Sequence, residues 1–126
     1  MQVTEQYQAW LRDYYRAIDA VETDTFMAMF TEDARMVFAN ADPIEGRDGI
    51  REALTGLRAS VGGWRHILHG TWQLEDDLIA FECEVVYTRL DGKEVTVRGG
   101  CFFAFAADGR CREQRIHVDT TPVFAA

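Results

Sequence analysis

The sequence predicts an α+β fold: a cone-shaped α+β barrel in which three N-terminal helices pack on a curved, mostly antiparallel sheet. Two observations lead to this prediction. Apolar residues recur at helical spacing through the first half of the chain, whereas they alternate with polar residues in the second half. Tight-turn sequences separate the alternating segments, so consecutive strands should pair as an antiparallel meander that follows the helices.

Composition limits both the domain count and the classes of partner. The 126 residues suffice for a single domain, residues 1–126, because two smaller units would each bury too little apolar surface. The formal net charge of −8 disfavours nucleic acid and anionic membrane surfaces as partners. No apolar segment reaches the roughly 20 residues of a membrane helix. The three cysteines lack a paired spacing and no export signal is visible, which predicts reduced thiols and a cytoplasmic location.

A long amphipathic helix opens the predicted fold. Its apolar side chains recur every third or fourth position and form one stripe, consisting of Tyr7, Leu11, Tyr14, Ile18 and Val21. A second, short helix should follow, because Thr23 or Asp24 can cap its N-terminus. Residues 35–39 form a short strand candidate, and the proline and glycine in residues 40–46 indicate a loop.

A third helix should follow that loop. Asp48 can cap its N-terminus, and the glycine pair at residues 62–63 ends it. Its apolar face consists of Ile50, Ala53, Leu54 and Leu57. A curved sheet covered by helices in this way leaves a cone that can hold a small molecule.

Four long strands complete the predicted sheet, over residues 64–75, 78–89, 95–105 and 110–119. Hairpin signals join the later strands, at residues 90–92 and at Asp108-Gly109. The side chains with inward parity, together with Phe38, should line an apolar ligand pocket. The predicted lining is Phe38, Trp64, Trp72, Phe81, Tyr87, Val97, Cys101, Phe103, Ile116 and Val118.

Several short motifs resemble those of a known family. They lie at residues 14–19, 29–34 and 44–51, and the closing residues 118–124 also match. On these motifs the chain resembles the nuclear-transport-factor-2-like fold, in its SnoaL-like and ketosteroid-isomerase-like branch, over nearly its whole length. The resemblance implies the cone-shaped fold and a homodimer. It leaves the chemistry open, because the family includes isomerases, cyclases, dehydratases, epoxide hydrolases and non-catalytic binding proteins.

The ketosteroid isomerase site can be compared with this sequence position by position. The tyrosine that the resemblance implies falls on Tyr14, the aspartate base on Phe38, and the second acid on or near Cys101. Two of the three functional groups are therefore missing, and steroid isomerisation by that mechanism is not expected. The site of limonene-type epoxide hydrolases is not evident either, because glycines follow Arg98 where an aspartate would be needed.

His66 is the main candidate for a general base. The resemblance to SnoaL-like cyclases and scytalone-type dehydratases implies a histidine on the inner sheet surface, and His66 has the inward parity of Trp64 and Leu68. A neutral imidazole in an apolar pocket can accept a proton near neutral pH. The competing interpretation is a core histidine that is hydrogen-bonded to a carbonyl or a tyrosine.

Three other polar residues are candidates for supporting roles. Tyr14 either donates a hydrogen bond to a substrate oxygen or only packs between helix and sheet. Asp119 either reaches the pocket mouth or caps the turn that follows it, and Asp42 is either a secondary base or a turn residue. His66 and His69 should point to opposite faces of one strand, so no metal site is predicted. No phosphate-binding loop is present, so no nucleotide cofactor is predicted.

Two functions are consistent with these residues. The first is a cofactor-independent enzyme that performs proton transfer on an apolar substrate, either a small carbonyl compound or a polyketide-like, polycyclic one, in a cyclisation, isomerisation or dehydration. His66 would be the base, Tyr14 the hydrogen-bond donor, and Asp119 or Asp42 the orienting acid. The second is a non-catalytic ligand-binding or dimeric interaction domain of the same fold. A homodimer is predicted through the outer sheet face, which carries Glu82, Glu84, Val86, Thr96, Arg98, Phe102, Gln114 or Arg115, and His117.

Overall fold

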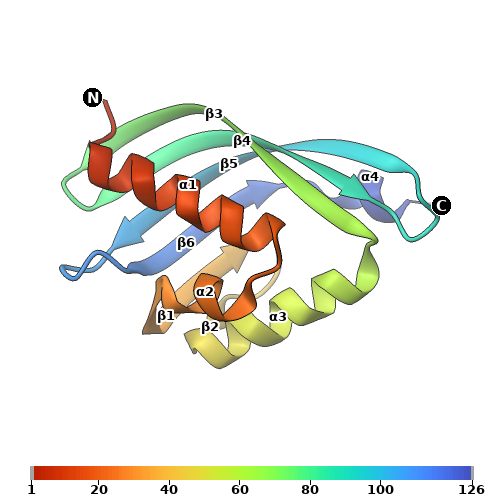
Figure 1. Cartoon of the computed structure of the whole chain (residues 1–126), viewed down its shortest axis with the longest axis horizontal. Helices are drawn as coiled ribbons and strands as arrows, with labels where there is room; N and C mark the ends of the chain where they lie inside the picture. Colours follow the sequence, from red (N-terminus) through yellow and green to blue (C-terminus); the bar gives the residue numbers. More distant parts are fainter. Residues whose placement is uncertain (1, 126) are drawn as a thin grey trace.

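A computed structural model describes residues 2–125, in which six strands form one curved sheet in the order β2-β1-β6-β5-β4-β3 (Figure 1). The strands are β1 (Phe30–Phe38), β2 (Ile44–Glu45), β3 (Gly63–Glu75), β4 (Leu78–Thr88), β5 (Glu94–Phe105) and β6 (Cys111–Val118). Only β1 and β6 pair in parallel. The predicted α+β class is confirmed, with a sheet that curves but does not close into a barrel. Residues 1 and 126 of the predicted domain lie outside the described residues.

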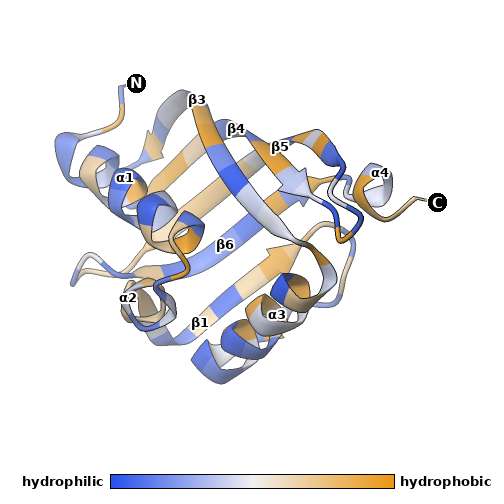
Figure 2. Cartoon of the chain, turned by 45° about the vertical axis from the view of Figure 1, so that its right-hand side comes forward, coloured by the Kyte–Doolittle hydropathy of each residue, from blue (hydrophilic) through white to orange (hydrophobic). Residues whose placement is uncertain are grey.

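The helices are α1 (Glu5–Asp19), α2 (Thr23–Ala28), α3 (Gly46–Ser60) and α4 (Thr121–Phe124). In Figure 1, α1 crosses in front of β3, β4 and β5, whereas α2 and α3 lie near β1. Figure 2 shows hydrophilic residues on the side of α1 that faces away from the sheet, as the predicted stripe requires. The three N-terminal helices were expected; α4 was not. Within residues 2–125, no helix has both the length and the hydropathy needed to cross a membrane.

The end of α1 differs from the sequence prediction. Tyr7, Leu11 and Tyr14 are buried as expected, but the helix ends at Asp19, and Val21 is 44% exposed. Val21 has a φ of 61°, while the backbone N–H groups of Val21 and Glu22 bond to the carbonyls of Ile18 and Ala17. This is a helix-ending motif that usually places glycine in the left-handed position. Val21 therefore turns the chain and does not extend the apolar stripe.

Other element boundaries were wrong by a few residues. The first strand begins at Phe30, not at residue 35, because Phe30 pairs with Cys111 on β6. The segment predicted as a loop contains β2, which pairs with β1. No side-chain cap bond begins α2 or α3, whose N-cap residues are Glu22 and Glu45, so Asp48 lies inside the first turn of α3. Strand pairing with distant segments sets these boundaries, and local sequence does not show it.

A β-bulge reverses the parity of β3. The register with β4 shifts between Leu68 and Thr71, and an extra residue on one strand turns all later side chains to the opposite face. Gln73 is consequently 5% exposed, whereas Trp72 is 44% exposed. The Trp72 ring lies across Gly70, where an added Cβ would come within 2.5 Å of it. The prediction that Trp72 lines the pocket is therefore wrong.

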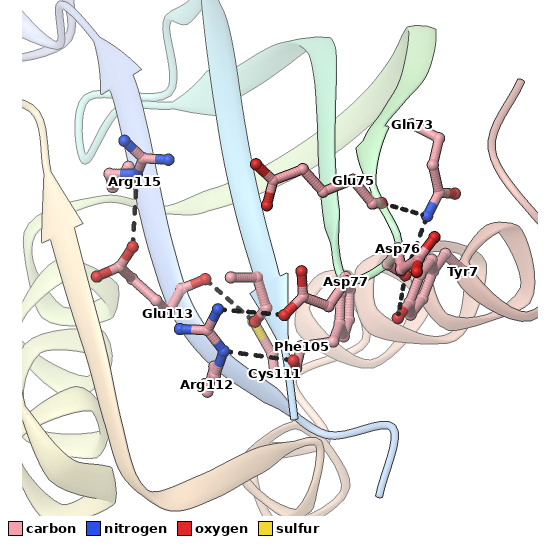
Figure 3. Close-up of polar contacts among 11 residues, drawn as sticks. Tyr7, Gln73, Glu75, Asp76, Asp77, Phe105, Cys111, Arg112, Glu113 and Arg115 are labelled. Carbon is pink, nitrogen blue, oxygen red and sulfur yellow. Dashed lines mark hydrogen bonds and ion pairs between the residues drawn. The ribbon is translucent and has the colours of Figure 1, made fainter. Parts of the chain in front are cut away.

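One end of the sheet is held together by polar contacts (Figure 3). Gln73 donates to the carbonyls of Glu75 and Asp76, and the Tyr7 hydroxyl of α1 donates to the Asp76 carbonyl at 3.2 Å. Nearby, the Cys111 thiol donates to the carbonyl of Glu113 at 3.4 Å. These contacts attach the start of α1 to the β3–β4 hairpin, so the ligand cavity must lie nearer the other end of α1.

Candidate functional site

A cavity of about 280 Å³ lies between the concave face of the sheet and helices α1, α2 and α3. This volume is near the lower end of the usual range of small-molecule pockets. The whole predicted apolar face of α3 lines it: Ile50, Ala53, Leu54 and Leu57. The sheet residues predicted as lining that do border the cavity are Phe38, Trp64, Tyr87, Cys101, Ile116 and Val118. His66 and Tyr14 border it as well.

Three predicted lining residues face the interior but lie outside the cavity. Phe103 meets the rings of Trp10 and Tyr14 on α1, and Phe81 packs edge-on against Phe103 with centroids 4.8 Å apart. This aromatic cluster fills the cone beneath α1. Val97 is also buried without lining the cavity, on the strand against which α4 packs. The sequence therefore predicted correctly that these side chains face the interior. It could not show that their positions along the strands lie outside the cavity.

His66 borders the cavity and is paired with Asp19, which does not itself line it. The Nδ1 atom of His66 lies 2.6 Å from Oδ1 of Asp19, and the backbone N–H of His66 donates to Oδ2 at 2.9 Å. When Asp19 is ionised and His66 is neutral, Nδ1 carries the ring proton, because a carboxylate only accepts hydrogen bonds, and Nε2 keeps its lone pair. The His66 side chain is 13% exposed and that of Asp19 is 28% exposed. The pair is thus partly sheltered from solvent, and its histidine borders the cavity.

Sequence reasoning did not single out Asp19. One signal was available: Asp19 ends a helix, where the partial negative charge of the carbonyl groups disfavours an acidic residue. An acid at such a position points to a role outside helix stability. The Trp64 indole N–H donates to the neighbouring carbonyl of Ile18 at 3.1 Å, which also ties the start of β3 to the end of α1.

Tyr15, another residue not singled out in the sequence, packs on the histidine. Its ring lies 4.7 Å from the His66 ring at an interplanar angle of 32°. Burial raises the pKa of Tyr15 and of Tyr14 well above the ordinary value, so both are neutral phenols. The Tyr14 hydroxyl donates to Oε1 of Gln114 at 3.1 Å, although its ring still lines the cavity. Tyr14 is therefore already engaged with a protein acceptor.

The family of this chain follows from its match to a family model. Residues 11–114 match the family model of the SnoaL-like domain. The chain belongs to the SnoaL-like domain family. No curated protein matches its sequence.

Solved structures share the fold of this SnoaL-like domain. A nuclear-transport-factor-2-like protein of unknown function from Burkholderia pseudomallei superposes with a TM-score of 0.86 at 16% identity, covering 98% of this chain and 100% of that one. The epoxide hydrolase/cyclase-like enzyme SalBIII, described for pyran ring formation in salinomycin, gives 0.83 at 19% identity, covering 96% of both chains. A putative polyketide cyclase from Xanthomonas campestris gives 0.78 at 18% identity, covering 94% and 93%. Identities this low establish the fold alone.

The three positions that correspond to the functional residues of ketosteroid isomerase lie together in this SnoaL-like domain. Tyr14, Phe38 and Cys101 all line the cavity, so the equivalent positions converge although the two acids are absent. The hydrogen-bonded carboxylate and imidazole of this chain are instead those of Asp19 and His66, at the end of α1 and the start of β3.

The two aspartates proposed from the sequence lie elsewhere. Asp119 is exposed, and its Oδ1 accepts the backbone N–H of Thr121 at 2.9 Å at the start of α4. The hydrogen bonds from Thr121 lower the pKa of the Asp119 carboxyl. Asp42 is exposed in the connection between β1 and β2. Neither borders the cavity, so the acid that orients His66 is Asp19.

A second histidine pair lies on the opposite face of β3. The Nε2 atom of His69 is 2.6 Å from Oε1 of Glu84, and both side chains are substantially exposed. His66 and His69 therefore face opposite sides, as the strand assignment predicted. No cluster of three or more metal-binding side chains occurs within the part of the chain that the structure describes.

Proposed function

We propose that this SnoaL-like domain is a cofactor-free enzyme that transfers a proton on a small apolar carbonyl compound. The observation that carries the proposal is His66, which lines an otherwise apolar cavity and is paired with Asp19 outside it. The reaction class is cyclisation, isomerisation or dehydration, each of which begins with removal of a proton from the carbon beside a carbonyl. The modest cavity favours a compound of one or two rings over a larger polycyclic one.

The proton acceptor is Nε2 of His66. When it takes the substrate proton, the imidazolium faces the Asp19 carboxylate and the carbonyl end of α1, and both stabilise its positive charge. The imidazolium can then return the proton to another carbon, or to a departing hydroxyl group. In a cyclisation the carbanion first attacks a second carbonyl of the same molecule, and His66 protonates the resulting alkoxide.

Tyr87 is the best-placed donor for the substrate oxygen. Its side chain lines the cavity and is 4% exposed, and no hydrogen bond joins its hydroxyl to another residue in the range 2–125. Burial raises the pKa of Tyr87 to about 12, so the hydroxyl keeps its proton at neutral pH. A neutral phenol can donate to an enolate oxygen without adding a charge to the apolar cavity.

Exchange of carbon-bound hydrogen tests this proposal without knowledge of the natural substrate. The ketone 2-tetralone, an apolar two-ring probe, is incubated with the protein in deuterium oxide, and deuterium uptake is followed by mass spectrometry. Wild-type protein should accelerate exchange above the buffer rate, and His66→Ala should remove the acceleration. Acceleration that survives in His66→Ala would reject His66 as the base.

The chain supplies a matched control for the exchange experiment. His69→Ala removes a histidine–carboxylate pair with the same 2.6 Å separation from the outer face of the same strand. It should exchange at the wild-type rate. If 2-tetralone binds but its exchange is not accelerated, the chain instead fits the alternative function, a non-catalytic ligand-binding domain.

A further inference from the structure

Two thiols and the catalytic histidine form an oblique row across the concave face. His66 lies opposite Val85, and Cys83 lies opposite Leu68, so His66 and Cys83 are diagonal neighbours on β3 and β4. Cys101 lies opposite Phe81 on β5 and is the diagonal neighbour of Cys83 on the other side. Diagonal neighbours of a sheet have Cα atoms roughly 7–8 Å apart, within reach of side-chain contact. All three side chains of this row border the cavity.

The Cys83 sulfur faces a position without a side chain. Its partner across the strands is Gly99, which also lines the cavity. A Cβ added at Gly99 would lie 3.7 Å from Cys83 Sγ. The absence of that carbon leaves space beside the sulfur, so a cavity ligand can approach the thiol from this side.

The three free cysteines differ in chemical environment. The neighbouring Cys101 side chain lowers the pKa of the Cys83 thiol despite burial, whereas the pKa of Cys101 is raised. Cys111 lies outside the cavity and donates to the carbonyls of Ala104 and Glu113 (Figure 3). Burial raises the pKa of Cys111 to about 12. Cys83 is also the thiol next to His66 in the row and faces the open position at Gly99, so it should be the most reactive of the three.

A further group indicates what kind of ligand would meet the thiol. Tyr87 borders the same apolar cavity, and within residues 2–125 its hydroxyl makes no hydrogen bond to another residue, so a ligand with an acceptor oxygen would complement it. We propose that Cys83 is a covalent binding site for apolar α,β-unsaturated carbonyl compounds. This goes beyond proton transfer on carbon, although it uses the same His66 as proton carrier.

The addition balances without a further reactant. The Cys83 proton passes to Nε2 of His66, and the sulfur forms a bond to the β-carbon of the enone. The electron pair of the carbon–carbon double bond moves toward the carbonyl and gives an enolate, which takes the proton back from His66 at its α-carbon. The net change is addition of S–H across the double bond, and nothing is oxidised or reduced.

Intact-protein and peptide mass spectrometry test the proposal with 4-phenylbut-3-en-2-one, an apolar aryl enone. Wild-type protein should gain one adduct, mapped to Cys83. Cys111→Ser, the matched control, should react like wild type, while Cys83→Ser and Cys83→Ala should gain no adduct. The para-carboxylate analogue of the enone should react at least about tenfold more slowly, because the apolar cavity disfavours its charge. Gly99→Ala should also slow the reaction by narrowing the approach to the sulfur.

The result that would overturn the proposal is an adduct mapped first to Cys101 or Cys111, or no adduct at all. Peptide mapping on the wild-type chain decides this even if a Cys83 variant does not fold. The outcome is also separate from the proposed function. Adduct formation without deuterium exchange would retain the covalent site and remove the proton-transfer enzyme, and exchange without an adduct would do the reverse.

Discussion

Both carboxylate oxygens of Asp19 bond to His66, a residue 47 positions later in the chain. One oxygen holds the imidazole at Nδ1 and the other holds the backbone N–H of the same residue. The carboxylate therefore positions the strand as well as the ring. This double contact selects the tautomer with a free Nε2, which is the form that a general base requires.

Replacing Asp19 by asparagine tests this control of the tautomer. An amide nitrogen can donate to Nδ1, which would move the ring proton to Nε2 and block the acceptor. Deuterium exchange of 2-tetralone should fall by roughly 10²–10⁴-fold, while the fold remains. Nitrogen chemical shifts of the His66 ring report the tautomer directly. Unchanged exchange together with a changed tautomer would refute the role given to Asp19.

Stability should decline in alkaline solution because of the tyrosines. Burial raises the pKa of all four, Tyr7, Tyr14, Tyr15 and Tyr87, the last to about 12. In the unfolded chain these groups ionise near pH 10. Their contribution to stability is therefore complete below about pH 10 and is lost as the pH rises through the folded-state values. Urea unfolding at a series of pH values should show this decline, and tyrosinate absorbance should appear together with unfolding.

A single variant isolates the contribution of Tyr87 to this loss of stability at high pH. Tyr87→Phe removes one buried ionisable group, so its unfolding free energy should fall less steeply than that of wild type above about pH 10. Equal slopes for the two proteins would mean that Tyr87 ionises as freely in the folded chain as in the unfolded one.

Val21→Gly should stabilise the chain. A β-branched residue at a φ of 61° is strained, and the left-handed conformation costs a non-glycine residue roughly 1–2 kcal/mol. Glycine removes that strain but adds flexibility to the unfolded chain, so the expected net gain is about 1 kcal/mol. Urea unfolding measures it. A loss of stability would show that the partly exposed valine side chain contributes more by packing than its backbone costs.

The outer sheet face is the basis of the dimer proposal. Phe102 lies there between Arg115, whose guanidinium is 5.1 Å from the ring centroid, and His117, at 5.8 Å between ring centroids. Of the two alternatives left open by the sequence, Gln114 is fully buried and Arg115 occupies the outer face. We propose a homodimer through this face. Sedimentation velocity at micromolar concentration should give twice the monomer mass.

A charge substitution tests where the two copies would meet. Phe102→Glu should shift the dimer to monomer, because it would bring like charges from the two copies into one apolar contact. Arg12→Glu, on the exposed side of α1, is the control and should leave the mass unchanged. A monomeric wild-type protein would reject the dimer, and a dimeric Phe102→Glu variant would reject this face.

The fold class, the N-terminal helices and the facing of most strand residues follow from the sequence alone. These properties are local: the alternation of Phe81, Cys83, Val85 and Tyr87 places them on one face, and all four are buried. The apolar spacing on α3 likewise predicted which helix face meets the cavity. The missing acids at Phe38 and Cys101 could be deduced from the motifs alone.

Which of these side chains form the site depends on the tertiary structure. Trp72 turns outward because a bulge is a property of two paired strands, not of one segment. Phe81 and Phe103 lie beneath α1, where aromatic rings fill the cone, and the space remains farther along the same strands. Asp19 meets His66 because α1 ends where β3 begins to curve over it. Periodicity is encoded within a segment, whereas register, depth and long-range contact depend on what the segment packs against.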